Sequence, residues 1–274
     1  MVFVAGIIGS ELAPTKSLST LPVATIVVGT ALSVIPVIRL MSIFGRKKVF
    51  LSACIYSILL IGLCIFSITK EIFFLFSFAS FCLGATVATM MQFRFAAIES
   101  VNLEQRASAT AVVLLGGLIS AFLGTEIATI GKSILETDFA GSFLLLALLF
   151  IIAFVLMIFF EPATKFKEHK EKSKRPLIDI ITQGSFIVAV SAATTGYVVM
   201  SFIMTATPVS MHVMDGHSLH HTKLVLQSHV IAMFLPSLST AYVVKYIGLT
   251  RMMLIGVLFL FVSVLIAFMS HALT

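Results

Sequence analysis

Two pairs of side chains with soft donor atoms stand out in the second half of the chain. Met200 and Met204 are four residues apart, and so are His229 and Met233. Residues at positions i and i+4 of a helix lie on the same face, so each pair would present its two side chains together. Uncharged thioethers and an imidazole suit Cu(I), whereas zinc, iron or magnesium calls for thiolates, carboxylates or water. Ordinary packing is the competing and more common explanation, because the chain has 13 methionines.

Four more histidines lie between these two pairs, and they suggest a second role for a metal ion. They are His212, His217, His220 and His221. Imidazoles are the commonest metal ligands, so this segment could gather a metal ion before it reaches the methionines. A wet polar loop is the alternative interpretation.

Two charged residues are candidates for coupling or gating. Glu126 stands near the end of a long apolar stretch, where acids often couple transport to protons or ions. The alternative is an interfacial acid beside Lys132. Arg94, with Glu99 little more than one helical turn further on, could form a gating pair. The alternative for Arg94 is that its long side chain simply extends to the lipid headgroups.

The elements that must position these residues are predicted to be membrane-spanning helices. The chain is 59% hydrophobic and only 11% charged, whereas an ordinary soluble domain is about 25% charged. Eight charge-free stretches are long enough to cross a roughly 30 Å hydrocarbon layer as helices. They cover residues 17–38, 49–69, 72–93, 107–125, 139–160, 180–214, 224–244 and 252–274, and a short ninth apolar piece covers residues 2–10. The predicted fold class is therefore an all-α integral membrane protein with about nine helices.

The same pattern excludes several functions. The chain has no glycine-rich phosphate loop and no solvent-accessible Ser/His/Asp set, so an ATP-driven pump or a hydrolase lacks its parts. We therefore expect a transporter and not an enzyme, with no cofactor, and with copper only as a possible transported substrate. The net charge of +6 comes from loops between apolar stretches, which indicates membrane orientation and not nucleic-acid binding.

The basic residues predict which end of the helices faces the cytoplasm. If the turn at residues 45–48 is cytoplasmic, strict alternation places 14 of the 18 basic residues on that side. Residues 180–214 then run outward and residues 224–244 run inward. At 1.5 Å per residue, Met200 lies roughly 9 Å below Ala206, and His229 lies roughly 10 Å below Thr222. Both soft-donor pairs are thus predicted at similar depth in the outer half of the membrane.

A polar segment divides the chain into two parts. Residues 161–176 are the only long polar stretch, with mixed charges and two prolines, and are predicted to be a cytoplasmic linker. We expect an N-terminal bundle at residues 1–160, with a partial first helix, and a partial C-terminal bundle at residues 177–274. A glycine with basic neighbours follows the stretch 17–38, at residues 42–47, and the stretch 224–244, at residues 245–251, which suggests duplicated halves.

Together, the six-helix half, the basic linker and the turn at Gly45, Arg46 and Lys47 resemble the major facilitator superfamily. The family usually has Asp-Arg ahead of this turn, where this chain has Ser42 and Ile43. The resemblance implies secondary transport through a cavity between two helical halves, with Gly45 and Arg46 in a gating turn. A complete member has twelve helices, so the resemblance predicts an incomplete bundle in lipid, with a second polypeptide as a candidate supplier of the missing helices. It also implies residence in a bacterial inner membrane.

Within this family, the two soft-donor pairs resemble the CcoA-type copper importers. By that resemblance, Met200, Met204, His229 and Met233 are the copper ligands, and the chain imports copper. Some relatives of that branch are linked instead to riboflavin uptake. A carrier of riboflavin or another small organic solute is therefore the alternative function, and an inactive truncated fragment is the third.

Overall fold

The computed structural model describes residues 2–161 and 176–272, and this part of the chain contains helices and no strands. The longer helices of the N-terminal half are α1 (Val2–Leu12), α2 (Leu21–Phe44), α3 (Arg46–Thr69), α4 (Phe73–Met90), α6 (Arg106–Gly131) and α7 (Ala140–Ile158). The short helix α5 (Phe93–Glu99) and single turns at η1 (Lys16–Leu18) and η2 (Leu103–Gln105) connect them. The C-terminal helices are α8 (Leu177–Ile181), α9 (Gly184–Pro208), η4 (Val209–Met214), α10 (Leu219–Ile247) and α11 (Leu249–Ala272).

The helices coincide with the charge-free stretches of the sequence. Seven described helical segments are long and apolar enough to cross a membrane. The remaining predicted stretch, residues 224–244, lies in α10, which is 29 residues long, and the short ninth piece is α1. The prediction of an all-α, incomplete helical bundle is thereby confirmed. Most of the predicted linker, residues 162–175, lies outside the described residues, so the division into two domains stays a prediction.

Two equivalent glycine turns join neighbouring long helices. Gly45, between α2 and α3, has φ +84° and ψ 156°, and Gly248, between α10 and α11, has φ +80° and ψ 158°. Only glycine adopts this region without strain. In each turn the glycine N–H donates to the carbonyl four residues earlier, at Met41 or Val244. The short sequence similarity between the two halves therefore corresponds to the same backbone geometry.

The helices of the N-terminal half pack tightly through small residues. Helices α2 and α4 approach most closely where Gly29 faces Gly84, because neither residue has a side chain to hold the backbones apart. Helix α3 packs against both α4 and α7. The main core of this half includes Phe76, Phe139 and Phe143, which are buried between these helices.

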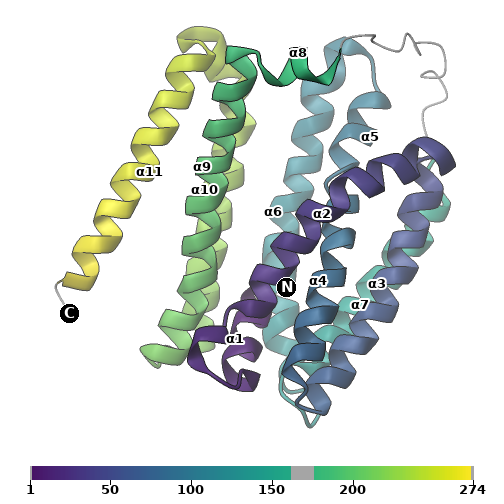
Figure 1. Ribbon diagram of the computed structural model, residues 1–274, viewed down its shortest axis with the longest axis vertical. Coiled ribbons are helices and arrows are strands. Elements are labelled where there is room, and N and C mark those ends of the chain that lie inside the picture. Colours follow the sequence, from purple (N-terminus) through teal and green to yellow (C-terminus); the bar gives the residue numbers. More distant parts are fainter. Residues whose placement is uncertain (1, 162–175, 273–274) are drawn as a thin grey trace.

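The C-terminal helices are arranged more openly beside this half (Figure 1). Helices α9 and α11 present large apolar side chains to the outside, including Phe202 at 74% exposure and Phe259 at 72%. In water such surfaces would be unfavourable, but in a bilayer they contact lipid.

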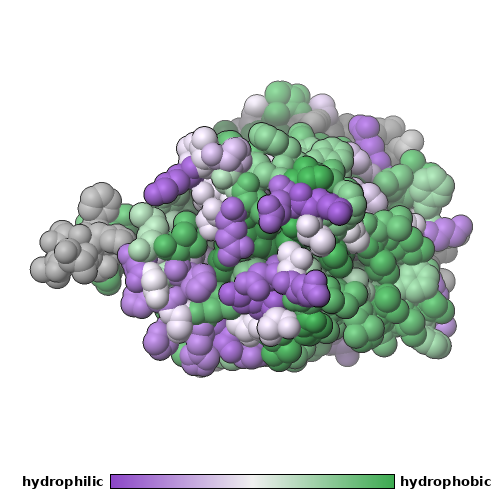
Figure 2. Space-filling model, turned by 90° about the horizontal axis from the view of Figure 1, so that it is seen from below, coloured by the Kyte–Doolittle hydropathy of each residue, from purple (hydrophilic) through white to green (hydrophobic). Residues whose placement is uncertain are grey.

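The two ends of the bundle differ from its sides. Figure 1 places the turn at Gly45, α5, α8 and the α10–α11 turn at one end, which we call the inner end following the predicted orientation. The opposite, outer end carries η4 and the α6–α7 loop. Viewed from the outer end, hydrophilic side chains gather over the middle of this face, whereas green apolar side chains dominate the flank on the right (Figure 2). This distribution is the one expected for helices that cross a membrane.

Candidate functional site

The two halves of the chain are joined near the outer end by polar contacts between α6 and α10. The Lys223 ammonium donates to Glu126 Oε1 at 2.7 Å. One turn further along α10, Gln227 Nε2 donates to Thr125 Oγ1, also at 2.7 Å. Lys223 is 8% exposed and Gln227 is 6% exposed, so both side chains leave water to make these bonds. The polar face of α10 therefore fits directly onto the outer part of α6.

This contact corrects the sequence-based interpretation of Glu126. The carboxylate does not lie beside Lys132 as an interfacial partner, because Lys132 forms its own ion pair with Asp138 at 3.2 Å. Glu126 instead bonds to the other half of the chain, through Lys223. Lys223 and Gln227 were not expected to contribute to a site. Their only sequence signal is that two polar residues stand four apart at the start of an apolar stretch.

Apolar contacts continue the α6–α10 interface toward the middle of the bundle. Val230 is 9% exposed, and the Phe234 ring lies against Gly117 of α6. A Cβ atom at Gly117 would lie 3.1 Å from two carbon atoms of that ring, which is tighter than ordinary van der Waals contact. Helix α1 also reaches across, with Gly6 facing Val209 of η4. The halves are thus in close apolar contact directly below the polar pair.

His229 lies on α10 just beyond Gln227, and its Nε2 atom is buried without a hydrogen-bond partner. Among the described side chains, only Ser80 Oγ and Arg106 Nε share this condition. A buried polar atom that lacks a partner is costly, and such atoms commonly mark a place where a ligand or water binds. Within the predicted set, His229 is thus the described residue whose buried polar atom lacks a hydrogen-bond partner.

The three predicted methionine ligands have different surroundings. Met200 and Met204 are half-buried on α9, and Met204 packs against the main core. Met233 on α10 is 38% exposed. Helices α9 and α10 contact each other, so all four predicted ligands lie on adjacent helices. The assignment of Met200, Met204, His229 and Met233 as one copper site stays a prediction.

The histidines at the outer end do not converge on one point. His212 Nδ1 lies 2.8 Å from the carbonyl oxygen of His217. The His217 and His221 rings are 6.5 Å apart, and the His220 and His221 rings are 6.1 Å apart. No group of three or more His, Cys, Asp and Glu side chains in the described part of the chain could hold a metal ion. The metal-gathering role of these histidines therefore stays a prediction, beside the alternative of a wet polar loop.

At the inner end, the predicted pair of Arg94 and Glu99 is also wrong. Glu99, at the end of α5, accepts two hydrogen bonds from Arg46, at 2.8 Å from Nε and 2.6 Å from Nη2. The Arg94 guanidinium instead lies over the ring of Phe95, 5.0 Å from its centroid. Because Arg46 begins α3 directly after the Gly45 turn, its side chain reaches α5 in a two-pronged bond of the strong kind. The turn at Gly45 is thus tied to α5 in this chain, which has Ser42 and Ile43 ahead of the turn.

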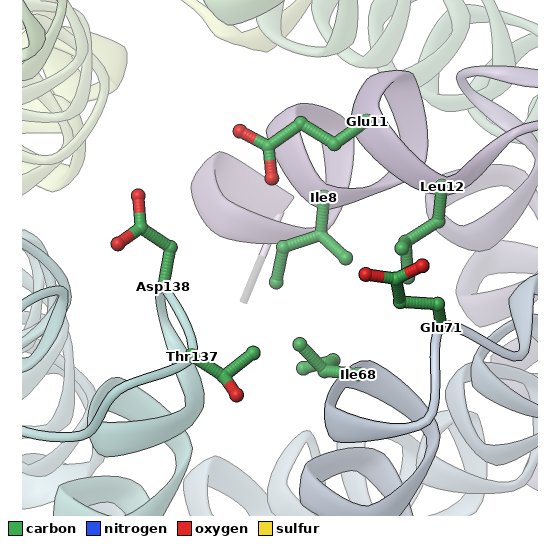
Figure 3. Close-up of a pocket in the computed structure, with 7 residues that line it drawn as sticks. All are labelled: Ile8, Glu11, Leu12, Ile68, Glu71, Thr137 and Asp138. Carbon is green, nitrogen blue, oxygen red and sulfur yellow. The ribbon is translucent and has the colours of Figure 1, made fainter.

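A further pocket of about 380 Å³ opens at the outer end, between α1, the α3–α4 turn and the α6–α7 loop. Figure 3 shows the carboxylates of Glu11, Glu71 and Asp138 around the pocket, which Ile8, Leu12, Ile68 and Thr137 also line. The pocket walls desolvate the Glu11 carboxyl and raise its pKa, a shift that Asp138 reinforces and Lys132 and His212 oppose. Sequence reasoning missed this pocket, because its residues come from three distant parts of the chain.

An all-helical membrane bundle whose two halves meet through side chains of facing helices is the architecture of a secondary transporter. The chain belongs to the Major Facilitator Superfamily, whose family model matches residues 1–274. It is therefore a multi-pass membrane protein of a transporter family.

Three curated relatives are similar in sequence to most of the chain. The riboflavin transporter RfnT of Brucella anthropi is 32% identical over 276 residues, which cover 97% of this chain and 68% of that protein. Two uncharacterized MFS-type transporters of Bacillus subtilis, YdeG and YddS, are 30% and 28% identical, over 62% and 61% of their own lengths. The chain thus spans about two thirds of the length of these relatives. No solved structure matches it.

Proposed function

We propose that this chain belongs to a secondary transporter of a small organic solute of the flavin class, in a bacterial inner membrane. The observation that carries the proposal is its similarity to a riboflavin transporter, at 32% identity along 97% of the chain. The two other relatives carry no stated substrate, and all three come from bacteria. The riboflavin alternative is thereby better supported than copper import.

His229 is the residue to which we assign solute recognition. Its buried Nε2 atom has no partner, and it lies on α10, directly below the outer contact between the halves. A flavin carries nitrogen and oxygen atoms along one ring edge and hydroxyl groups on its side chain, so it offers partners for an imidazole nitrogen. Loss of one buried hydrogen bond costs about 1–2 kcal/mol, which corresponds to a roughly 5- to 30-fold change in affinity.

Copper import is the second candidate, and the same atom favours it. An unpartnered imidazole nitrogen can bind Cu(I), with Met200 and Met204 on the adjacent helix and Met233 one turn further along α10. For copper the thioethers would be essential, whereas for a flavin they would only shape the site.

Uptake measurements separate the two candidates. The 274-residue chain would be expressed in bacteria that lack flavin synthesis and uptake, and radiolabelled riboflavin and cellular copper would both be measured. For a flavin carrier, His229→Leu should raise the half-saturating riboflavin concentration roughly 5- to 30-fold, because one buried hydrogen bond is lost. Met200→Leu should then change riboflavin uptake little. Met253→Leu on α11, outside the proposed site, serves as the control.

The pattern of losses decides between the candidates. If copper accumulation depends on the chain and falls in both His229→Leu and Met200→Leu, the chain imports copper. If cells with the parent chain accumulate neither solute, the 274-residue chain is inactive alone. The same substitutions would then be tested after co-expression with a polypeptide that supplies further helices.

A further inference from the structure

A pocket of about 330 Å³ lies at the inner end, between the end of α2 and the start of α3, and we call it the inner pocket. It is lined by Leu40, Phe44, Lys48, Val49 and Ser52. Leu40 is 44% exposed and Phe44 is 55% exposed, so the inner pocket opens at the surface of the bundle. Its volume falls in the range of roughly 300–1,000 Å³ that is typical of sites for small ligands. All of its residues belong to the N-terminal half, so the pocket is separate from the contacts between α6 and α10.

The walls of the inner pocket combine an apolar surface with one charge. Leu40 and Phe44 lie one turn apart on α2, and Val49, at 9% exposure, lies on α3. On the same helix, the Ser52 hydroxyl donates to the Lys48 carbonyl oxygen at 2.7 Å. Lys48 is therefore the one charged residue of the lining, and it is exposed. Such walls suit a ligand that has both an anionic group and an apolar part.

Three consecutive cations begin α3, and two of them already have partners within the protein. Arg46 donates two hydrogen bonds to Glu99, at 2.8 and 2.6 Å. The Lys47 ammonium donates to the carbonyl oxygen of Ile158, at the end of α7, at 2.6 Å. Lys48 forms no ion pair with any acidic side chain in the described part of the chain. Of the three cations, Lys48 is thus the one whose charge is available to a ligand.

The charge around the inner pocket is positive. Residues 12–70 include six Lys and Arg and no Asp or Glu. Glu99, which reaches this turn from α5, is already paired with Arg46. The predicted orientation places this end at the cytoplasmic side, where anionic phospholipids give the leaflet a negative surface potential. The inner pocket is therefore complementary in charge to anionic headgroups at the depth where it lies.

We propose that the inner pocket binds an anionic phospholipid of the inner leaflet. The lipid phosphate lies at the Lys48 ammonium, and part of one acyl chain lies against Leu40, Phe44 and Val49. A soluble anion would gain nothing from these apolar walls, and the chain of an uncharged lipid would make no use of Lys48. Basic pockets between spanning helices on the cytoplasmic side bind phospholipid headgroups in this way. The site does not depend on which solute the chain transports.

The test uses the absence of tryptophan from the sequence. Phe44→Trp places a single fluorescent reporter in the lining of the inner pocket, where brominated acyl chains quench it on contact. The purified chain would be reconstituted into phosphatidylcholine bilayers that contain brominated phosphatidylglycerol or, at the same fraction, brominated phosphatidylcholine. The brominated phosphatidylglycerol should bind about fivefold more strongly at this reporter, which is the preference that one lysine near anionic headgroups supplies.

Matched variants locate the preference at one side chain. In the Phe44→Trp background, Lys48→Gln should abolish the preference for phosphatidylglycerol, whereas Lys48→Arg should retain it. Lys245→Gln removes an exposed cation from the inner end of α10 and should leave the preference unchanged. Phe259→Trp, on the exposed face of α11, should show no preference between the two lipids. Equal quenching by brominated phosphatidylcholine in all Phe44→Trp variants verifies that the pocket is intact.

Four results would overturn the lipid site. The first is an absence of quenching at the Phe44→Trp reporter by either brominated lipid. The second is an equal preference at the Phe44→Trp and Phe259→Trp reporters, since anionic lipid would then be enriched around the whole protein. The third is a preference that survives in Lys48→Gln. The fourth is loss of the preference when millimolar inorganic phosphate is added, because the pocket would then bind a free anion and not a lipid.

Discussion

Helices α2 and α4 approach each other closely at Gly84, and this makes Gly84→Ala a demanding test of the fold. A Cβ atom at Gly84 would lie 2.5 Å from the carbonyl carbon of Gly29 and 2.7 Å from the carbonyl oxygen of Ile26. Both atoms belong to the backbone of α2, so no flexible side chain can move aside. Helices α2 and α4 must separate to admit the methyl group.

The size of the effect follows from these distances. To restore a contact of 3.4 Å from the present 2.5 and 2.7 Å, the two backbones must move apart by about 0.7 to 0.9 Å along their buried faces. Overpacking of this kind costs about 1–3 kcal/mol, and a clash with rigid backbone belongs near the upper end of that range. Alanine recovers about 1 kcal/mol through its better helix propensity. The expected net loss is about 2 kcal/mol, which lowers the unfolding temperature by roughly 4–8 °C for a chain of this size.

The native thiols provide the assay. Cys54 is 5% exposed and Cys64 is 0% exposed, so both react with a fluorogenic thiol dye only after the helices separate. Purified protein in mild detergent would be heated with the dye, and the midpoint of the fluorescence rise would be compared between variants. Cys82, which is less buried, would be replaced by serine in all proteins to lower the background.

Gly62→Ala on α3 is the matched control, because nothing lies within 4 Å of a Cβ atom built there. It gains the same helix propensity without a clash, so it should unfold at the same temperature as the parent or slightly above it. If Gly84→Ala unfolds at the same temperature as Gly62→Ala, the close packing of α2 on α4 is wrong.

Two other predictions concern orientation and pH. A cysteine at Ser218 should react with an impermeant reagent added to intact cells. A cysteine at the exposed Thr250 should react only after the membrane is opened. The reverse pattern would refute the orientation inferred from the basic residues. Because desolvation raises the pKa of Glu11, the folded state holds its proton more tightly than the unfolded state. The stabilising contribution is complete below the unfolded pKa and is lost as the pH rises through the folded pKa. Glu11→Gln cannot ionise. As the pH is raised through this window, the unfolding temperature of the parent should therefore fall relative to that of Glu11→Gln. Parallel pH profiles for the two proteins would contradict the pKa shift.

The features that could be predicted from the sequence are those that depend on short segments. The length and apolarity of each stretch were sufficient to predict a spanning helix, because a helix in lipid satisfies its own backbone hydrogen bonds. The turns at Gly45 and Gly248 could be predicted to match, because both require a backbone conformation that glycine alone adopts readily. The assignment of His229 to a solute site rests on its residue type and position and stays a prediction.

Pairs of charged residues could not be assigned in the same way. Proximity in the sequence suggested Lys132 for Glu126 and Arg94 for Glu99, and both suggestions were wrong. The actual partners, Lys223 and Arg46, lie 97 and 53 residues away. The outer pocket with its three carboxylates was missed for the same reason, since its walls come from three separate segments.

By itself, the sequence indicated a membrane protein and the approximate position of each long helix, because burial in lipid depends on the composition of each segment. The helix ends differ from the predicted ones by several residues, as in α6 (Arg106–Gly131), which was expected at residues 107–125. Only the tertiary structure decided which charges meet, that Gly29 and Gly84 lie where α2 and α4 touch, and that α6 and α10 are joined by polar contacts. These features depend on the rotation and depth of one helix against another. Rotation and depth are set by the packing of both surfaces at once, and no single segment contains that information.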